Sequence, residues 1–271
     1  MPNTPPNQSI ERAALVLQAL GSAETGALRA SDIGRAVGLG PSTTSRLLTT
    51  LERLDYVRRD PSTQEYRIGT AVLLLASQGL NHNPVHRESR AAAQELAHRT
   101  GLTANVAVRD RDHAVYLCHF EGALTRKSHT MVGMAQPLHA SALGKVLLLD
   151  LSQAERVELL GDLEQYTERT LTDHDALTAD LCTSAARGWC YEDQELALGR
   201  FCVAVPIRNA GGSVVAALSI SGGLTVLRDR DLAEIAEDLI EVGDRISVGL
   251  GLLGAVRTSA AQTGGPAVHS R

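Results

Sequence analysis

The chain has 271 residues, a formal net charge of −5 and 44% hydrophobic residues, which is enough for two modest domains that each bury a core. No apolar run reaches the ~18 residues of a membrane-spanning helix, so no membrane partner is expected. Phenylalanine and tryptophan occur only two and one times, which disfavours a stacking platform for single-stranded nucleic acid. Residues 1–7 lack the apolar core of a signal peptide, so we expect a disordered lead and a cytoplasmic protein.

Three helices are predicted in the first 54 residues. Residues 8–20 repeat apolar positions at helical spacing, and a short second helix begins near Ser31. A turn of about three residues then leads into a third helix, a spacing that is typical of a helix-turn-helix. The apolar stripe of this third helix, which we expect to be buried, consists of Leu47, Leu48, Leu51 and Leu54.

Two short strands, 56–59 and 65–68, follow the third helix and flank a turn-forming segment. Helix, helix, helix and hairpin is the order of a winged helix-turn-helix, here over residues 8–69. In this fold the helix after the turn enters the major groove, where short hydroxyls suit phosphates and arginines suit phosphates or guanine edges. The DNA-contacting residues that we predict are Ser42, Thr43, Thr44, Ser45, Arg46, Thr50, Arg53, Arg58, Arg59 and Arg67.

Residues 70–84 are predicted as a linker helix and residues 85–255 as a second domain. A helix over 86–100, a two-stranded hairpin, a helix after Ser141 and two further strands precede a long final helix near the end. This order indicates an α/β domain with a mainly antiparallel sheet, which makes the whole chain α+β. Residues 256–271 are rich in Ser, Gly and Ala without periodicity, so we expect a disordered tail.

Neither a metal nor a cofactor is expected. The four cysteines are scattered without a CxxC pair, as in a reduced chain with buried thiols. His82, His86 and His119 lack the spacing of metal ligands and fall in different predicted elements.

The two halves together resemble the IclR family of bacterial transcriptional regulators, from about Gln8 to Leu250. The most similar stretches are QSIERAALVLQAL at the start, QPLHASALGK at 136–145, and the segment from Gly188 through 202–204. The resemblance implies a winged helix-turn-helix domain joined to a GAF-like effector domain that binds a small metabolite, often a carboxylate or an aromatic compound. It also implies a homodimer or a dimer of dimers.

Carried over position by position, the resemblance implies an effector pocket between the helix start after PLHAS and three strands. The residues expected to form this pocket are Ala142, Leu143, Glu192, Cys202, Ser219 and Ser221. The family usually has aspartate where this chain has Glu192, and the adjoining Asp193 is an alternative for that position in a shifted register. This departure leaves the size of the ligand open. Lys145 is the one basic residue expected nearby, and we expect it to point away from the helix start.

The chain is therefore interpreted as a ligand-responsive transcriptional regulator of a metabolic operon, with repression the expected mode and double-stranded operator DNA and a small molecule as partners. The alternative is an enzyme fused to a DNA-binding module, with Cys202 as nucleophile and His139 or Glu192 as base. The sequence offers no oriented third group and no cofactor motif for such an enzyme.

Overall fold

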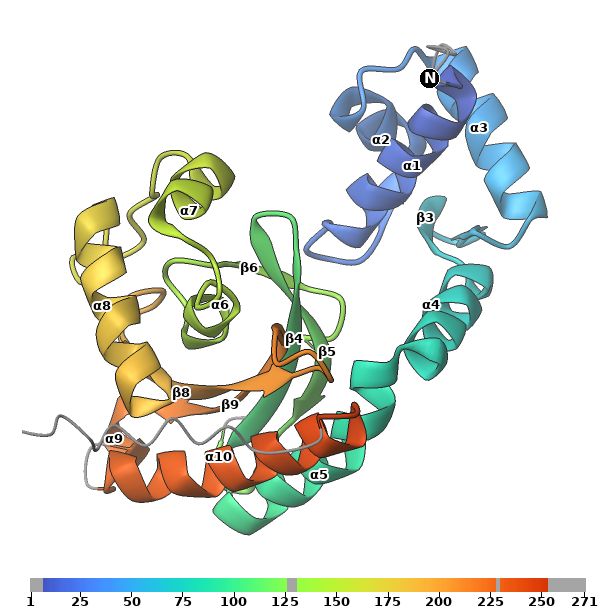
Figure 1. The fold of residues 1–271 in the computed structure, drawn as a ribbon. Helices are drawn as coiled ribbons and strands as arrows, with labels where there is room; N and C mark the ends of the chain where they lie inside the picture. Colours follow the sequence, from blue (N-terminus) through green and yellow to red (C-terminus); the bar gives the residue numbers. More distant parts are fainter. Residues whose placement is uncertain (1–6, 126–130, 228–229, 253–271) are drawn as a thin grey trace, which may run out of the picture. The chain divides into compact units, whose positions relative to one another are not determined.

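The computed structural model describes residues 7–125, 131–227 and 230–252. Residues 1–6 of the predicted lead and the whole predicted tail at 256–271 lie outside this range. The chain forms two compact units, the N-terminal unit at Met1–His82 and the C-terminal unit at Asn83–Arg271 (Figure 1). Among the described residues, no helix combines the length and the apolarity needed to cross a membrane.

The N-terminal unit has the predicted order of helices and hairpin. Its helices are α1 (Gln8–Gly21), α2 (Ala30–Ala36), α3 (Pro41–Arg53) and α4 (Thr70–His82). Its antiparallel sheet has the order β1-β3-β2, with β1 at Leu28–Arg29, β2 at Val57–Arg59 and β3 at Glu65–Ile68. The strand β1 was not predicted, because two residues are too few to show alternation and their pairing with β3 is not local.

The core of the N-terminal unit lies between α1, α2, α3 and the small sheet, with Val16, Ile33 and Leu48 fully buried. Leu48 and Leu51 of the predicted stripe are buried, whereas Leu54 is 51% exposed. The stripe is shorter than predicted because α3 ends at Arg53 and Leu54 is its C-cap residue.

The C-terminal unit is built on one six-stranded antiparallel sheet with the order β6-β5-β4-β9-β8-β7. Its strands are β4 (Thr103–Asp110), β5 (His113–Phe120), β6 (Ala135–Pro137), β7 (Cys190–Asp193), β8 (Arg200–Arg208) and β9 (Val214–Gly223). Its helices are α5 (Pro84–Thr100), α6 (Ala142–Leu147), α7 (Gln153–Leu160), α8 (His174–Arg187), α9 (Leu224–Leu227) and α10 (Leu232–Gly249). The predicted mainly antiparallel sheet is therefore confirmed.

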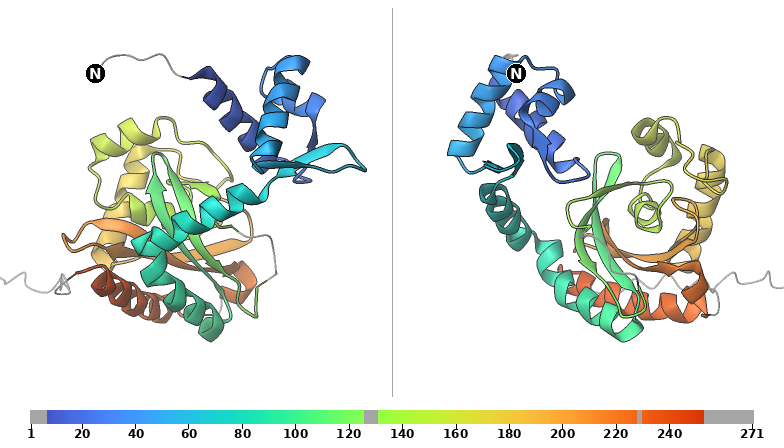
Figure 2. Two further views of the ribbon diagram at one scale, coloured as in Figure 1. Left: turned by 90° about the vertical axis from the view of Figure 1, so that its right-hand side faces the viewer. Right: turned by 180° about the vertical axis from the view of Figure 1, so that it is seen from behind.

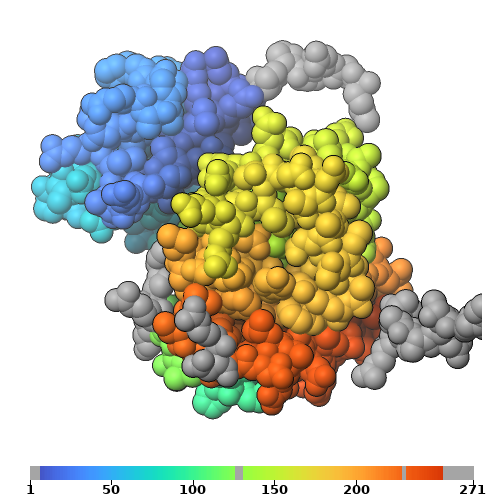
Figure 3. Space-filling model, turned by 90° about the vertical axis from the view of Figure 1, so that its left-hand side faces the viewer, coloured from blue at the N-terminus to red at the C-terminus, as the bar shows by residue number. Residues whose placement is uncertain are grey.

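Helices cover both faces of this sheet. The long helices α5 and α10 pack on one face, and the sheet curves around the short helix α6 on the other (Figure 2). In Figure 3 the yellow segments of α7 and α8 form the outer surface on the α6 side, and all six residues of α6 are buried. The α6 side therefore holds the main core of the unit, in which α6 packs against apolar residues of β8 and β9.

Local signals explain several of these element ends. α5 and α8 end at Gly101 and Gly188, which adopt the left-handed conformation that favours glycine. α7 begins with the predicted capping box, in which Ser152 and Glu155 bond each other's backbone N–H groups. α6 is capped at its N-terminus by Ser141, whose hydroxyl accepts from the Gly144 amide at 3.1 Å.

Candidate DNA-binding surface and effector pocket

The first candidate surface is the exposed side of α3. This helix begins at Pro41 after Gly40, so its first backbone N–H groups have no partner within the helix. The predicted DNA-contacting side chains of α3 that are exposed are Ser42, Ser45, Arg46, Thr50 and Arg53. A helix start with free amides, hydroxyls and long guanidinium side chains is able to hold phosphates and to reach base edges.

Two positions on α3 differ from the prediction. Thr44 is 1% exposed, and its hydroxyl donates to the Gly40 carbonyl oxygen at 3.1 Å. A β-carbon at Gly34 would lie 2.9 Å from this hydroxyl oxygen, so Thr44 fills the close contact between α2 and α3. We therefore correct the prediction that Thr44 contacts DNA. Thr49, which was not predicted, is exposed one turn after Ser45, and helical spacing places it opposite the leucine stripe.

The arginines of the β2–β3 hairpin are exposed but differ in the side chains that lie beside them. Arg58 donates from Nε to Asp55 at 2.8 Å, and this bond lowers the pKa of Asp55. Arg59 contacts the Gln64 side chain and lies 5.7 Å from the centre of the Tyr66 ring. Arg67 pairs in register with Arg58 across the hairpin. The carboxylate of Asp55 thus offsets part of the charge of Arg58.

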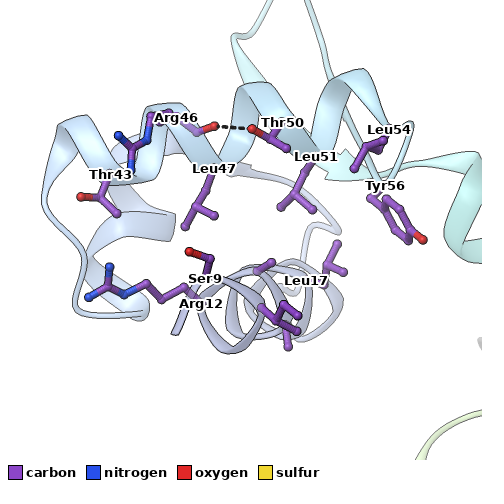
Figure 4. A pocket seen from close by; sticks show the side chains of 13 residues that line it. Ser9, Arg12, Leu17, Thr43, Arg46, Leu47, Thr50, Leu51, Leu54 and Tyr56 are labelled. Atoms are coloured by element: carbon purple, nitrogen blue, oxygen red, sulfur yellow. Dashed lines mark hydrogen bonds between the residues drawn. The ribbon is translucent and has the colours of Figure 1, made fainter. Parts of the chain in front are cut away.

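A groove of about 590 Å³ runs between α1 and α3. Figure 4 shows Arg12, Thr43 and Arg46 at one end of this groove and Leu54 and Tyr56 at the other. Between these ends its lining is mostly apolar, so the N-terminal unit exposes a hydrophobic surface beside the start of α3.

The second candidate site is the α6 side of the sheet in the C-terminal unit. The strand register places Glu192 opposite Cys202, Cys202 opposite Ser221, and Ser221 opposite Thr103, which forms one row across four strands. Ser219 lies on the same face as Ser221, because residues two apart on a strand share a face. Ala142 and Leu143 form the start of α6 and pack in the same core as Cys202.

Most of the residues predicted for the effector pocket are buried behind the open cavity of this face. Ala142, Leu143, Cys202 and Ser219 are at most 1% exposed, and Glu192 is fully buried. The neighbouring cavity, of about 480 Å³, is lined by Ser221 but by none of these five residues. Its polar lining, among the described residues, includes Thr103, Asn105, Tyr116, His119, Glu121, Thr125, Arg200, Ser221 and Thr225.

Arg200 is the main residue that sequence reasoning missed. Contrary to the expectation that Lys145 is the only nearby basic residue, Arg200 lines the cavity, and its Nε lies 3.5 Å from Oε2 of Glu192. Burial raises the pKa of Glu192, and the Arg200 guanidinium and the Leu196 amide oppose this rise. A signal was available, because Arg200 stands two positions before Cys202 on one strand and so shares its face.

Lys145 does not line the cavity. Its side chain is 1% exposed, and its Nζ lies 2.6 Å from Glu195 Oε1 and 3.1 Å from Asp180 Oδ2. These contacts join α6 to α8 and to the segment after β7. Lys145 therefore links elements of the fold and does not face the cavity.

Both units match family models. Residues 9–61 match the IclR helix-turn-helix domain, and residues 77–248 match the model described as bacterial transcriptional regulator IclR C-terminal. The chain is 32% identical over 246 residues to the HTH-type transcriptional regulator XynR of Escherichia coli K12, an alignment that covers 90% of this chain and 97% of XynR. It is also 32% identical over 247 residues to the HTH-type transcriptional repressor AllR of the same strain, covering 90% and 91% of the two chains.

Solved structures share the fold of this chain. A crystal structure of an IclR transcriptional regulator from Alicyclobacillus acidocaldarius has a TM-score of 0.82 at 26% identity, covering 91% of this chain and 100% of that one. An IclR homolog from Microbacterium hydrocarbonoxydans, crystallised with 4-hydroxybenzoate, shares the fold with a TM-score of 0.79 at 24% identity, covering 90% and 99%. This chain therefore belongs to the IclR family of bacterial transcriptional regulators.

Proposed function

We propose that this regulator is a repressor whose affinity for a double-stranded operator changes when a small molecule binds on the α6 side of the C-terminal unit. The observation that carries the proposal is the cavity of about 480 Å³ on this face, whose polar lining includes Thr103 of β4, Arg200 of β8 and Ser221 of β9. The relative AllR is named as a repressor, and the Microbacterium homolog was crystallised with an aromatic acid. We propose a carboxylate or an aromatic metabolite as the effector and the cytoplasm as the location.

The alternative of an enzyme is not supported. The family and the relatives compared above are transcriptional regulators, so the chain is a regulator and not an enzyme. The residues named for catalysis agree with this, because burial raises the pKa of the Cys202 thiol to about 11 and keeps it protonated at neutral pH. His139 is also engaged, with its Nε2 2.9 Å from the Glu164 carbonyl oxygen.

The proposed response is a shift between two arrangements of a dimer. An effector changes operator occupancy only by as much as its affinity differs between the DNA-binding and the released arrangement. For a dimeric helix-turn-helix protein, half-sites should lie about 34 Å apart or at a multiple of this distance.

Replacing Arg46 with alanine should weaken operator binding by ~1–3 kcal/mol and relax the base preference at one position, if Arg46 reads a guanine edge. The measurement is fluorescence anisotropy with an operator fragment selected from a random DNA pool.

Arg59→Ala should instead weaken binding to all sequences equally and lower the salt slope of the binding constant by about one. Arg245→Ala, an exposed arginine of α10, is the matched control. Wild-type affinity in both Arg46→Ala and Arg59→Ala would contradict the proposed DNA surface.

We also propose that the chain forms a homodimer or a dimer of dimers through the N-terminal unit. The α4 residues Leu73, Leu74 and Leu75 are each more than half exposed, and no residue of α4 is buried. They leave a hydrophobic surface on α4 that a second copy of the same unit would cover.

The Leu74→Asp variant should shift the sedimentation profile towards monomer at micromolar concentration, because a charge on this surface opposes its burial. Val157→Asp, an exposed apolar position on α7 in the other unit, should leave the profile unchanged. A wild-type protein that sediments only as a monomer would remove the basis for a two-fold operator.

A further inference from the structure

The hydroxyl of Thr49 is bonded to its own helix. Thr49 is exposed on α3, and its Oγ1 donates to the Ser45 carbonyl oxygen at 3.0 Å. Thr50 makes the same kind of bond to the Arg46 carbonyl oxygen at 3.0 Å, which Figure 4 shows as a dashed line. A threonine hydroxyl has a single hydrogen to donate, so in this arrangement Thr49 has none left for a phosphate oxygen of DNA. It offers a ligand only its γ-methyl group and the lone pairs of its oxygen.

Thr49 lies on the outer side of α3, between two arginines. The buried residues of this helix are Thr44, Leu48 and Leu51. At about 3.6 residues per turn, Thr49 falls on the side opposite to them. Arg46 stands three positions before Thr49 and Arg53 four positions after it, which is the spacing of neighbours on one helix face. Thr50 instead lines the groove between α1 and α3, so Thr49 is the threonine that the outer side of the helix presents.

A methyl group on this side of α3 matches one base of DNA. Thymine presents a methyl group in the major groove, on its C5 atom, and apolar contact with this methyl distinguishes thymine from the other bases. Contact between the two methyl groups removes apolar surface from water. The bond to the Ser45 carbonyl holds the β-branched Thr49 side chain in one rotamer before DNA arrives, so the contact costs little side-chain entropy.

We propose that Thr49 is a specificity-determining residue of the DNA surface, and that its methyl group contacts the C5-methyl group of a thymine in each operator half-site. This inference rests on the proposed DNA surface of α3. Arg46 and Arg53 supply positive charge on either side of this contact, which suits phosphates or guanine edges. Thr49 adds a preference for one base without a hydrogen bond and without a charge.

The test replaces thymine with deoxyuridine, which lacks only the C5-methyl group. The full-length protein is titrated by fluorescence anisotropy against an operator fragment selected from a random DNA pool, and each thymine of one half-site is replaced in turn. We expect one replacement to weaken binding of the wild-type protein about three- to fivefold, the factor that corresponds to burying one methyl group. The factor should be the same at two salt concentrations, because no phosphate contact is lost.

Two variants of Thr49 separate the methyl group from the hydroxyl. Thr49→Ser removes the methyl group, so it should bind the thymine and the deoxyuridine operators with equal affinity. Thr49→Val keeps a methyl group and removes the hydroxyl, so it should retain the preference for thymine. The matched control is Thr183→Ser on α8, an exposed threonine whose hydroxyl donates to the Ala179 carbonyl oxygen at 3.0 Å, and it should retain the preference too.

The remaining outcomes would overturn the proposal. These are a selected half-site without thymine, no loss of wild-type affinity with any deoxyuridine, and a preference for thymine that persists in Thr49→Ser. Loss of affinity in Thr49→Val but not in Thr49→Ser would assign the DNA contact to the hydroxyl and would also overturn it. Wild-type affinity in both Arg46→Ala and Arg59→Ala would refute the DNA surface of α3 itself, so the two failures are distinguishable.

Discussion

Replacing Lys145 with methionine is expected to destabilise the C-terminal unit by about 3–5 kcal/mol, the usual cost of removing one partner from a buried ion pair. The Lys145 side chain is 1% exposed and lies between Glu195 at 2.6 Å and Asp180 at 3.1 Å. Methionine fills a similar volume but leaves the Glu195 carboxylate, which is itself nearly buried, without a cation. A domain is stable by only about 5–15 kcal/mol, so this loss is a large share of the total.

Urea unfolding of the full chain, followed by tryptophan fluorescence, reports on the unfolding of the C-terminal unit, in which the substitution lies. The single tryptophan, Trp189, stands next to β7, and the Arg187 guanidinium lies 4.1 Å from its ring centre. The matched control is Arg245→Met, which breaks the exposed pair with Glu95 at 3.6 Å and should change little. The double variant Lys145→Met/Glu195→Gln should recover part of the lost stability. An unchanged unfolding midpoint in Lys145→Met would show that the ion pair does not stabilise the fold.

The loss in Lys145→Met should also depend on pH. Burial raises the pKa of Glu195, and Lys145 opposes this rise, so without Lys145 the folded-state pKa of Glu195 rises further. A carboxyl group whose folded pKa is raised binds its proton more tightly in the folded than in the unfolded state, which makes folding more favourable as pH falls. The difference in stability between wild type and Lys145→Met should therefore shrink between pH 7 and pH 5.

Local signals in the sequence were enough to predict most of the fold. The end of α5 at Gly101, the capping box of Ser152 and the hairpin of β4 and β5 each depend on residues close together in the chain. The short strands β1 and β6 depend on pairing with β3 and β5, which periodicity within two or three residues does not reveal.

The sequence predicted which face of the sheet carries the candidate site, but not which of its side chains reach the cavity. Alternation along β9 places Ser219 and Ser221 on one face, and the resemblance places Cys202 and Glu192 beside them. Which of these side chains reaches the cavity depends on how α6 covers the sheet, and that contact joins residues far apart in sequence. Thr44 differs in this respect, because it stands four residues before Leu48 and seven before Leu51, so helical spacing already places it on the buried face of α3.

Replacing Gly144 with alanine is the second change expected to have a large effect. A β-carbon at Gly144 would lie 2.3 Å from the Leu138 carbonyl oxygen and 2.4 Å from the Leu138 α-carbon, both of which are backbone atoms. These atoms cannot move without shifting the segment that also holds Ser141, whose hydroxyl donates to the Pro137 carbonyl oxygen at 2.8 Å. Overpacking of this kind costs ~1–3 kcal/mol, and contact with backbone places Gly144→Ala at the upper end of that range.

The direction of the stability change in Gly144→Ala identifies its cause. The clash with Leu138 lowers stability, whereas the higher helix propensity of alanine raises it. Alanine is favoured over glycine inside a helix by about 1 kcal/mol, so Gly144→Ala would stabilise the unit if α6 had room. The control is Gly211→Ala on an exposed turn, where the nearest atom to the added carbon is Asn209 Oδ1 at 3.4 Å. Trp189 fluorescence in urea should show a lower midpoint for Gly144→Ala and little change for Gly211→Ala. A higher midpoint for Gly144→Ala would mean that α6 is free to shift away from Leu138, and the α6 side of the sheet would then be less rigid than its packing indicates.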